Sequence, residues 1–323
     1  MSRSLLAATL ALALPSLTTA ETLTLYTSQP NADAQQTVDA FMAANPEIEV
    51  DWVRDGTTKL MARVAAEIEA GQPQADVLLI ADTVTLEGLA QAGQLAAYSS
   101  PEDAAYDVSL YSADGYYHST KLITTGIVYN TGAQIVPTSW ADLAKPEMAN
   151  LVAMPSPLYS GAALIHLATL TGTDGLGWDY YKALAANNTR AEGGNGGTFK
   201  AVASGEKPYG VLVDFMAVRA KADGSPIAFV FPEEGVSYVT EPVAIMAGTE
   251  HMGAAQKFVD FVLSEEGQNL VVNMGYIPAR NGVASPEGFP TRDEIKLMDF
   301  DAAQALADTD ANKARFAEVF GVQ

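Results

Sequence analysis

The sequence predicts an α/β protein of two units, each a mainly parallel sheet flanked by helices. Strand-like and helix-like runs alternate along the chain, which is the order typical of parallel sheets covered on both faces. The chain has 323 residues, more than one hydrophobic core ordinarily organises. The alternation begins again after Tyr129 and Asn130, so we expect a second unit from there.

Residues 1–20 have the pattern of an export signal. Arg3 gives a basic start, residues 5–14 form an apolar core, and small residues precede a cleavage site at Ala20. The apolar core is too short to span a bilayer. We expect cleavage near Ala20 and an exported chain; a buried N-terminal helix is the alternative.

The first unit should contain three strand–helix pairs. Its strands are rich in β-branched and aromatic residues, and its helices end at turn formers such as Asn45 and Gly71. Leu60, Val64 and Ile68 share one helix face. We expect strands at 22–26, 48–53 and 75–80, and helices at 31–43, 59–70 and 85–92.

The second unit has further buried strands and amphipathic helices. A helix over 253–265 would turn Phe258, Phe261 and Val262 inward. Residues 121–128 and 238–245 are extended and can carry the chain between the units. We expect strands at 151–154, 209–213, 227–231 and 242–246, and helices at 164–170, 178–187, 198–204 and 253–265.

Charge and composition exclude several classes of function. The net charge of −21 argues against binding to nucleic acid or to anionic membranes. There is no cysteine, so thiol chemistry and disulfides are impossible. Any anion site in such an acidic chain must be local and built from N–H groups and hydroxyls.

The sequence has no recognisable catalytic or metal-binding motif. Its three histidines are scattered, without metal-ligand spacing, and the glycine-rich residues 193–197 lack the Lys-Ser/Thr of a phosphate-binding loop. The acidic pair Glu233-Glu234 is more typical of a solvated turn than of acid–base catalysis. We therefore expect no enzyme, no metal and no cofactor.

Residues 155–163 form a candidate anion site. A short apolar strand precedes Ser160-Gly161-Ala162, and a buried helix follows. Small residues leave N–H groups open at a helix start, where the helix dipole favours negative charge. Ser160 can cap the helix and also donate to a ligand. A plain capped helix is the alternative interpretation.

Several segments resemble periplasmic solute-binding proteins of ABC importers, in the branch of ferric-ion and phosphonate binders. The resemblance rests on residues 75–77, 129–130, 137–143, 201–206 and 255–268. It implies a two-lobe periplasmic binding protein fold of type II, with the ligand in the cleft between the lobes. It also implies a periplasmic monomer that presents its ligand to an inner-membrane ABC permease.

The resemblance also implies domain boundaries. Residues 1–20 would be the signal peptide, and residues 21–124 and 241–285 would form lobe 1. Residues 125–240 and 286–323 would form lobe 2, on which the C-terminal helices pack.

The ligands of the ferric members of the family are missing. Their histidine, glutamate and tyrosine pair correspond to Pro30, Ala81, Phe215 and Met216, none of which suits a hard ferric ion. The family's Ser-Gly-Ala is present at Ser160, Gly161 and Ala162, and one of its two asparagines at Asn195; Val213 replaces the other. The resemblance therefore implies that the anion is the cargo.

Acidic and hydroxyl side chains nearby suggest how the rest of a ligand is held. Asp214 ends an apolar strand and Asp82 follows another; a ligand ammonium would pair with either, as in 2-aminoethylphosphonate. Helix capping is the alternative for both. Thr27, Ser28 and Thr125 can donate hydroxyls or simply close turns.

The sequence thus predicts an importer's solute-binding protein for a small anion, with 2-aminoethylphosphonate as the example. A ferric-ion binder with altered ligands is one alternative, and a secreted phosphate-ester hydrolase is another of a different class.

Overall fold

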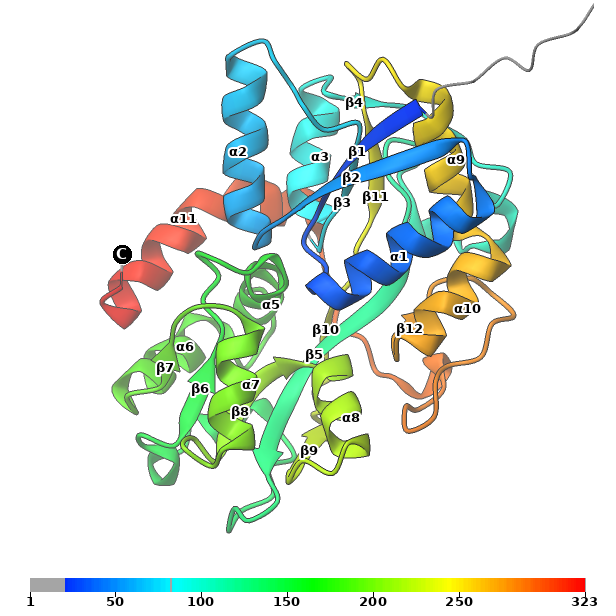
Figure 1. Cartoon of the computed structure of the whole chain (residues 1–323). Coiled ribbons are helices and arrows are strands. Elements are labelled where there is room, and N and C mark those ends of the chain that lie inside the picture. The colour runs from blue at the N-terminus through cyan, green and yellow to red at the C-terminus, as the bar shows by residue number, and fades with distance from the viewer. Residues whose placement is uncertain (1–20, 82, 323) are drawn as a thin grey trace, which may run out of the picture.

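The computed structural model describes residues 21–81 and 83–322, which form two α/β lobes (Figure 1). A cavity lined by residues of both lobes lies between them. The two-lobe architecture predicted from the sequence is confirmed. The predicted export signal, residues 1–20, lies outside the described residues, as does Asp82. None of the helices in the described part is long and apolar enough to cross a membrane.

The first lobe has a five-stranded sheet in the order β2-β1-β3-β11-β4. Residues of β1 alternate between two cores: Leu23 and Leu25 pack with Phe41 and Phe258, whereas Tyr26 packs with Leu60. Helices therefore cover both faces. The strands are β1 (Glu21–Thr27), β2 (Ile48–Arg54), β3 (Val77–Leu79), β4 (Leu95–Ala96) and β11 (Val243–Met246); the helices are α1 (Asn31–Ala44), α2 (Thr57–Glu69), α3 (Thr83–Gln91) and α9 (Met252–Leu263).

The second lobe has a sheet in the order β10-β5-β8-β6-β7, and β9 and β12 also pair with β5. Ile127 and Val128 are adjacent on β5 and belong to different cores, so this sheet is also covered on both faces. The strands are β5 (Lys121–Asn130), β6 (Val152–Met154), β7 (Arg190–Ala191), β8 (Tyr209–Val213), β9 (Ile227–Val230), β10 (Ser237–Val239) and β12 (Ile277–Pro278); the helices are α4 (Trp140–Leu143), α5 (Gly161–Thr171), α6 (Gly177–Ala186), α7 (Asn195–Ala203) and α8 (Asp214–Ala222).

Both sheets are mixed, because the strands next to the lobe crossings run against their neighbours. Strand β11 is antiparallel to β3 and β4, and β5 is antiparallel to β8, β9 and β10. The parallel pairs are β1 with β2 and β3, and β6 with β7 and β8. The carboxyl ends of these parallel strands face the cleft, where ligands of open α/β sheets bind.

The C-terminal part differs from the sequence prediction. The helix expected over 253–265 ends at Leu263, and α10 (Glu265–Asn273) follows at once because Ser264 caps it, accepting from Gly267 N at 3.1 Å. The last helix, α11 (Ala302–Phe320), contacts α3 of the first lobe and α5 and α6 of the second. This helix therefore joins the two lobes on one side of the molecule (Figure 1).

Candidate ligand-binding cleft

A cavity of about 630 Å³ lies between the lobes. The first lobe contributes Ser28, Arg54 and Thr57 to its wall, and the second lobe contributes Ser160 and Asn195. The cavity is large enough for a small metabolite. Four of the predicted site residues line it from the second lobe, namely Ser160, Gly161, Ala162 and Asn195, and Ser28 lines it from the first.

Three helices begin at this cavity. Ser160 caps α5, and its Oγ accepts from Ala163 N at 3.3 Å and from Asn195 Nδ2 at 3.4 Å. Asn195 is the first residue of α7, and Thr57 is the first residue of α2 on the opposite lobe. Neither Gly194 nor Gly56 supplies a side-chain cap, so N–H groups at both helix starts stay available. Three helix dipoles thus favour negative charge in the same cavity.

Within the part of the chain that the structure describes, the side chain of Asn195 has an oxygen atom without a hydrogen-bond partner. Its Oδ1 is buried without a hydrogen bond among the described residues, although its Nδ2 donates to Ser160. An unsatisfied buried acceptor costs about 1–3 kcal/mol. A ligand that donates a hydrogen bond there, such as a protonated phosphonate oxygen, would remove this cost.

Two basic side chains in the cavity wall were missed by the sequence interpretation. Arg54 ends β2, and its Nε donates to Gln29 O at 2.8 Å; Lys200 lies on α7. Among the salt bridges of the described residues, none involves Arg54 or Lys200. Their charges therefore add to those of the helix starts. The position of Arg54 at the carboxyl end of a strand was the signal that could have identified it.

The three predicted hydroxyl residues have different surroundings. Ser28 faces the cavity and accepts from Ala81 N at 2.9 Å, which joins the segments that follow β1 and β3. Thr27 is fully buried and accepts from Gln29 N at 3.1 Å. Thr125 is buried on β5, in register with Val213 of β8. Neither threonine lines the cavity.

Asp214 lies behind the cavity wall and not in it. The side chain is 1% exposed, and Oδ2 accepts from Thr124 N at 3.0 Å and from Thr124 Oγ1 at 2.7 Å. Oδ1 accepts from Phe215 N at 2.7 Å, so both oxygens have protein partners. Burial raises the pKa of Asp214 to about 6, although these hydrogen bonds act to lower it. The carboxylate thus fixes the start of α8 against β5.

The floor of the cavity holds a buried charge cluster that the sequence did not reveal. Glu241 lines the cavity, pairs with Lys121 and accepts from Gln29 Nε2 at 3.1 Å. Lys121 Nζ lies 4.2 Å from the centre of the Tyr276 ring. Lys121 begins β5 and Glu241 precedes β11, so the pair joins two segments at the crossings between the lobes.

A second, partly buried ion pair links the lobes directly. Asp33 of α1 accepts from Arg219 Nη1 of α8 at 3.1 Å and also from the Tyr276 hydroxyl. The Arg219 guanidinium lies 4.5 Å from the centre of the Tyr276 ring. Burial and the neighbouring Glu241 and Asp33 carboxylates raise the pKa of Tyr276 well above its usual value, so this phenol remains a donor.

Tyr159 fills the space between two glycines at the mouth of the cleft. A Cβ atom on Gly56 of the first lobe would come within 2.7 Å of Tyr159 Cζ, and one on Gly194 within 2.9 Å of Cε1. The ring is 38% exposed. The approach of the lobes at this point therefore depends on the absence of side chains at Gly56 and Gly194.

The cavity wall offers little to a metal ion. Pro30, Ala81, Phe215 and Met216 all line it, and none supplies an anionic oxygen. Within residues 21–81 and 83–322, no group of three His, Cys, Asp or Glu side chains is placed to hold a metal.

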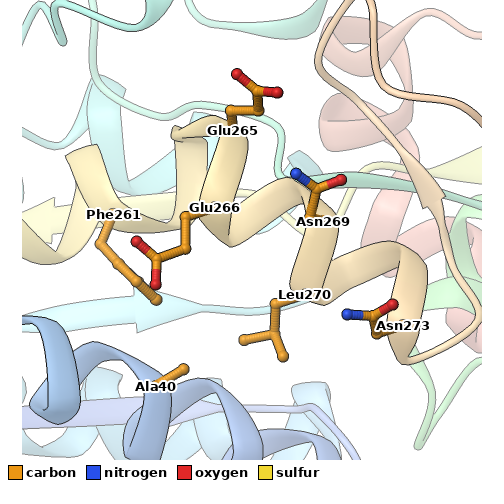
Figure 2. A pocket seen from close by; sticks show the side chains of 7 residues that line it. All are labelled: Ala40, Phe261, Glu265, Glu266, Asn269, Leu270 and Asn273. Carbon is orange, nitrogen blue, oxygen red and sulfur yellow. The ribbon is translucent and has the colours of Figure 1, made fainter.

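A separate hollow of about 560 Å³ lies between α1 and α10 (Figure 2). Glu265, Glu266, Asn269 and Asn273 of α10 line it, and Ala40 of α1 lies on the opposite side. None of the described residues that line it is basic, and two are acidic, so this hollow is negative and does not suit an anion.

Comparisons with known proteins identify a family of bacterial solute-binding proteins. A model of the family "Bacterial extracellular solute-binding protein" matches residues 72–305. An uncharacterised protein of Haemophilus influenzae is 28% identical over 295 residues, covering 86% of this chain and 84% of that protein. A probable ABC transporter periplasmic-binding protein of Sinorhizobium fredii is 25% identical over 267 residues, covering 78% and 71%.

Solved structures show the same fold at lower identity. The periplasmic binding protein AfuA of Actinobacillus pleuropneumoniae, with fructose-6-phosphate bound, superposes with a TM-score of 0.85 at 22% identity, covering 94% of this chain and 99% of that chain. Iron-bound HitA of Pseudomonas aeruginosa gives 0.81 at 24% identity, covering 93% and 99%. These structures support the fold and leave the ligand open.

Proposed function

The chain belongs to the bacterial extracellular solute-binding protein family, and we propose that its ligand is a small phosphonate or phosphate ester, with 2-aminoethylphosphonate as the leading candidate. As a member of this family, it is a periplasmic solute-binding component of an ABC transporter, which binds a ligand for a permease and is not an enzyme. The phosphate-ester hydrolase considered from the sequence is therefore excluded.

The convergence of three helix starts on one cavity carries the proposal. The α2, α5 and α7 N-termini, together with Arg54 and Lys200, create a positive region inside a chain whose net charge is −21. A tetrahedral anion with several oxygens can accept hydrogen bonds from N–H groups of both lobes at once. Binding of such a ligand would draw the lobes together by a hinge motion and then hold them closed.

The relatives include both ligand classes, and the residues of this chain's own cavity favour the phosphate or phosphonate class. AfuA carries fructose-6-phosphate, a phosphate ester, whereas HitA carries iron. In this chain, the apolar Pro30, Ala81 and Phe215 occupy the positions where the sequence resemblance places ferric ligands. A ferric-ion binder with altered ligands is the remaining alternative, and it predicts a coloured complex with ferric salt.

We further infer that the protein works as a monomer, with residues 21–124 and 241–285 in lobe 1 and residues 125–240 and 286–323 in lobe 2. The two separate sheets support a division near Lys121 and Glu241. Within the range 241–285, β12 (Ile277–Pro278) pairs with β5 and so belongs to the sheet of the second lobe. Sedimentation velocity with and without ligand tests the monomer.

A thermal-shift panel of phosphonates, phosphate esters, polyamines and ferric citrate tests the ligand class. A ligand at a concentration of 100 Kd stabilises the folded state by about 2.7 kcal/mol, which gives a clear rise in Tm. We expect the rise with phosphonates or phosphate esters and none with polyamines. A rise with ferric citrate alone, with a charge-transfer absorption band, would instead support the iron alternative.

A further inference from the structure

We propose that Glu241 recognises the end of the ligand opposite its anion, by accepting a hydrogen bond from an ammonium or hydroxyl group. The inference rests on the proposed function, because it assigns a second pole to the same cavity. It identifies the cargo as a bifunctional molecule that carries both an anion and a hydrogen-bond donor.

The free oxygen of Glu241 is the first argument. The residue lines the cavity although it is only 2% exposed. Its Oε2 pairs with Lys121 and accepts from Gln29 Nε2, whereas no described residue donates to Oε1. A carboxylate held on one oxygen and free on the other is oriented before the ligand arrives. Glu241 therefore has one acceptor position left, on a residue that lines the site.

The backbone of Glu241 gives a second argument. Its φ of 40° lies in the left-handed region, which residues other than glycine rarely adopt. The neighbouring strand start holds it there, because Thr120 Oγ1 donates to Glu241 O at 2.7 Å and Lys121 N donates to Thr240 O at 3.2 Å. Strained residues that surrounding contacts maintain are concentrated at functional sites.

Glu241 also fills the role that the sequence assigned to other acids. Asp214 has partners on both oxygens and does not reach the cavity. Among the described residues that line the cavity, Glu241 alone is acidic. An ammonium should bind it more strongly than a hydroxyl, because a hydrogen bond between two charged groups is about twice as strong as a neutral one.

Isothermal titration calorimetry with three matched ligands tests the inference. Ethylphosphonate lacks a donor, 2-hydroxyethylphosphonate carries a hydroxyl, and 2-aminoethylphosphonate carries an ammonium. We expect the native protein to bind the amine about ten-fold or more tightly than ethylphosphonate, with the hydroxyl compound between them. In the double variant K121M/E241Q, these ratios should fall to about two-fold or less.

The double variant is needed because Glu241→Gln alone would leave the buried Lys121 charge unpaired. Urea unfolding establishes that the variant is folded; if it is not, Glu241→Asp, which withdraws the free oxygen by one methylene, should reduce the amine preference in its place. Glu265→Gln, in the hollow between α1 and α10, is the charge-matched control and should leave the ratios unchanged.

The outcomes separate the two proposals. Equal binding of all three ligands by the native protein, or an unchanged amine preference in the folded variant, would overturn the role of Glu241 alone. If none of the three ligands and no phosphate ester bound, the proposed function would fail, and this inference with it.

Discussion

The wall and the floor of the cleft are built in opposite ways. The wall includes helix starts, whose neighbouring residues, such as Gly161 and Ala162 of α5, line the cavity. The floor consists of charged and polar side chains from distant segments: Gln29 and Glu241 are 212 positions apart, and Asp33 and Tyr276 are 243 apart. Local chemistry thus forms the wall of the cavity, and long-range pairing forms its floor.

The two regions also differ in how they depend on charge. A helix start favours an anion by roughly 0.3–1 kcal/mol and imposes little cost on the empty protein. A buried ion pair contributes little net stability, yet it is expensive to break because the remaining charge stays buried. We therefore expect breaking an ion pair of the floor to alter mainly stability, apart from the amine preference assigned to Glu241, and changes in the wall to alter mainly binding.

The largest expected effect is that of Lys121→Met on stability. The substitution removes the partner of Glu241, whose carboxylate is then buried and unpaired. The free energy of unfolding should fall by about 3–5 kcal/mol, as measured by urea unfolding without ligand.

The double variant K121M/E241Q is the control, because it removes both charges and should recover most of that loss. If Lys121→Met proved as stable as the native protein, the floor would not depend on this pair, and the contrast between the regions would fail.

The second-largest expected effect is a loss of ligand affinity without a loss of stability. Ser160→Asp keeps a good N-cap for α5 but places a carboxylate where the ligand anion would lie. We expect the affinity for the best phosphonate or phosphate ligand to fall about 100-fold or more, by like-charge repulsion in a desolvated site. Calorimetric titration measures it.

Ser160→Asn is the matched control, since asparagine caps helices equally well and carries no charge. It should lose far less affinity than the aspartate variant. Similar losses in both variants would mean that Ser160 acts through its hydroxyl group and not through the positive potential of the helix start.

The same contrast explains what the sequence could predict. The α5 start was recognisable because its residues are contiguous and small, and individual strands could be located from short apolar runs such as 209–213. Glu241 was not recognisable, because its partners Lys121 and Gln29 are brought to it only by the crossings between the lobes. Asp214 misled the prediction, since an acid after an apolar strand can face either the cavity or the neighbouring strand.

A third effect concerns the contact between the lobes. Gly56→Ala would place a Cβ atom 2.7 Å from Tyr159 Cζ, so the ring must shift before the cleft can close as it does here. We expect a loss of about 1 kcal/mol in binding free energy, or about five-fold in Kd. Gly253→Ala, whose new Cβ meets nothing within 4 Å, should not change the affinity. Equal affinities of the Gly56→Ala variant and the native protein would show that Tyr159 does not limit closure.

The smallest effect is the pH dependence that Asp214 contributes from behind the wall. Burial raises the pKa of this carboxyl from 3.8 to about 6 in the folded protein, so between those values the folded state holds a proton that the unfolded state has released. Its contribution to stability therefore increases as the pH falls, by about 1 kcal/mol between pH 6 and pH 5.

The difference in unfolding free energy between the native protein and Asp214→Asn isolates this contribution. His166 acts in the opposite direction, since burial lowers its pKa to about 3 and the unfolded state takes up a proton below about pH 6.5. Both proteins carry His166, so its effect cancels in the difference. A difference that stayed flat or declined as the pH fell from 6 to 5 would mean that Asp214 ionises normally. The wall would then carry a full negative charge behind its helix starts at every pH in this range.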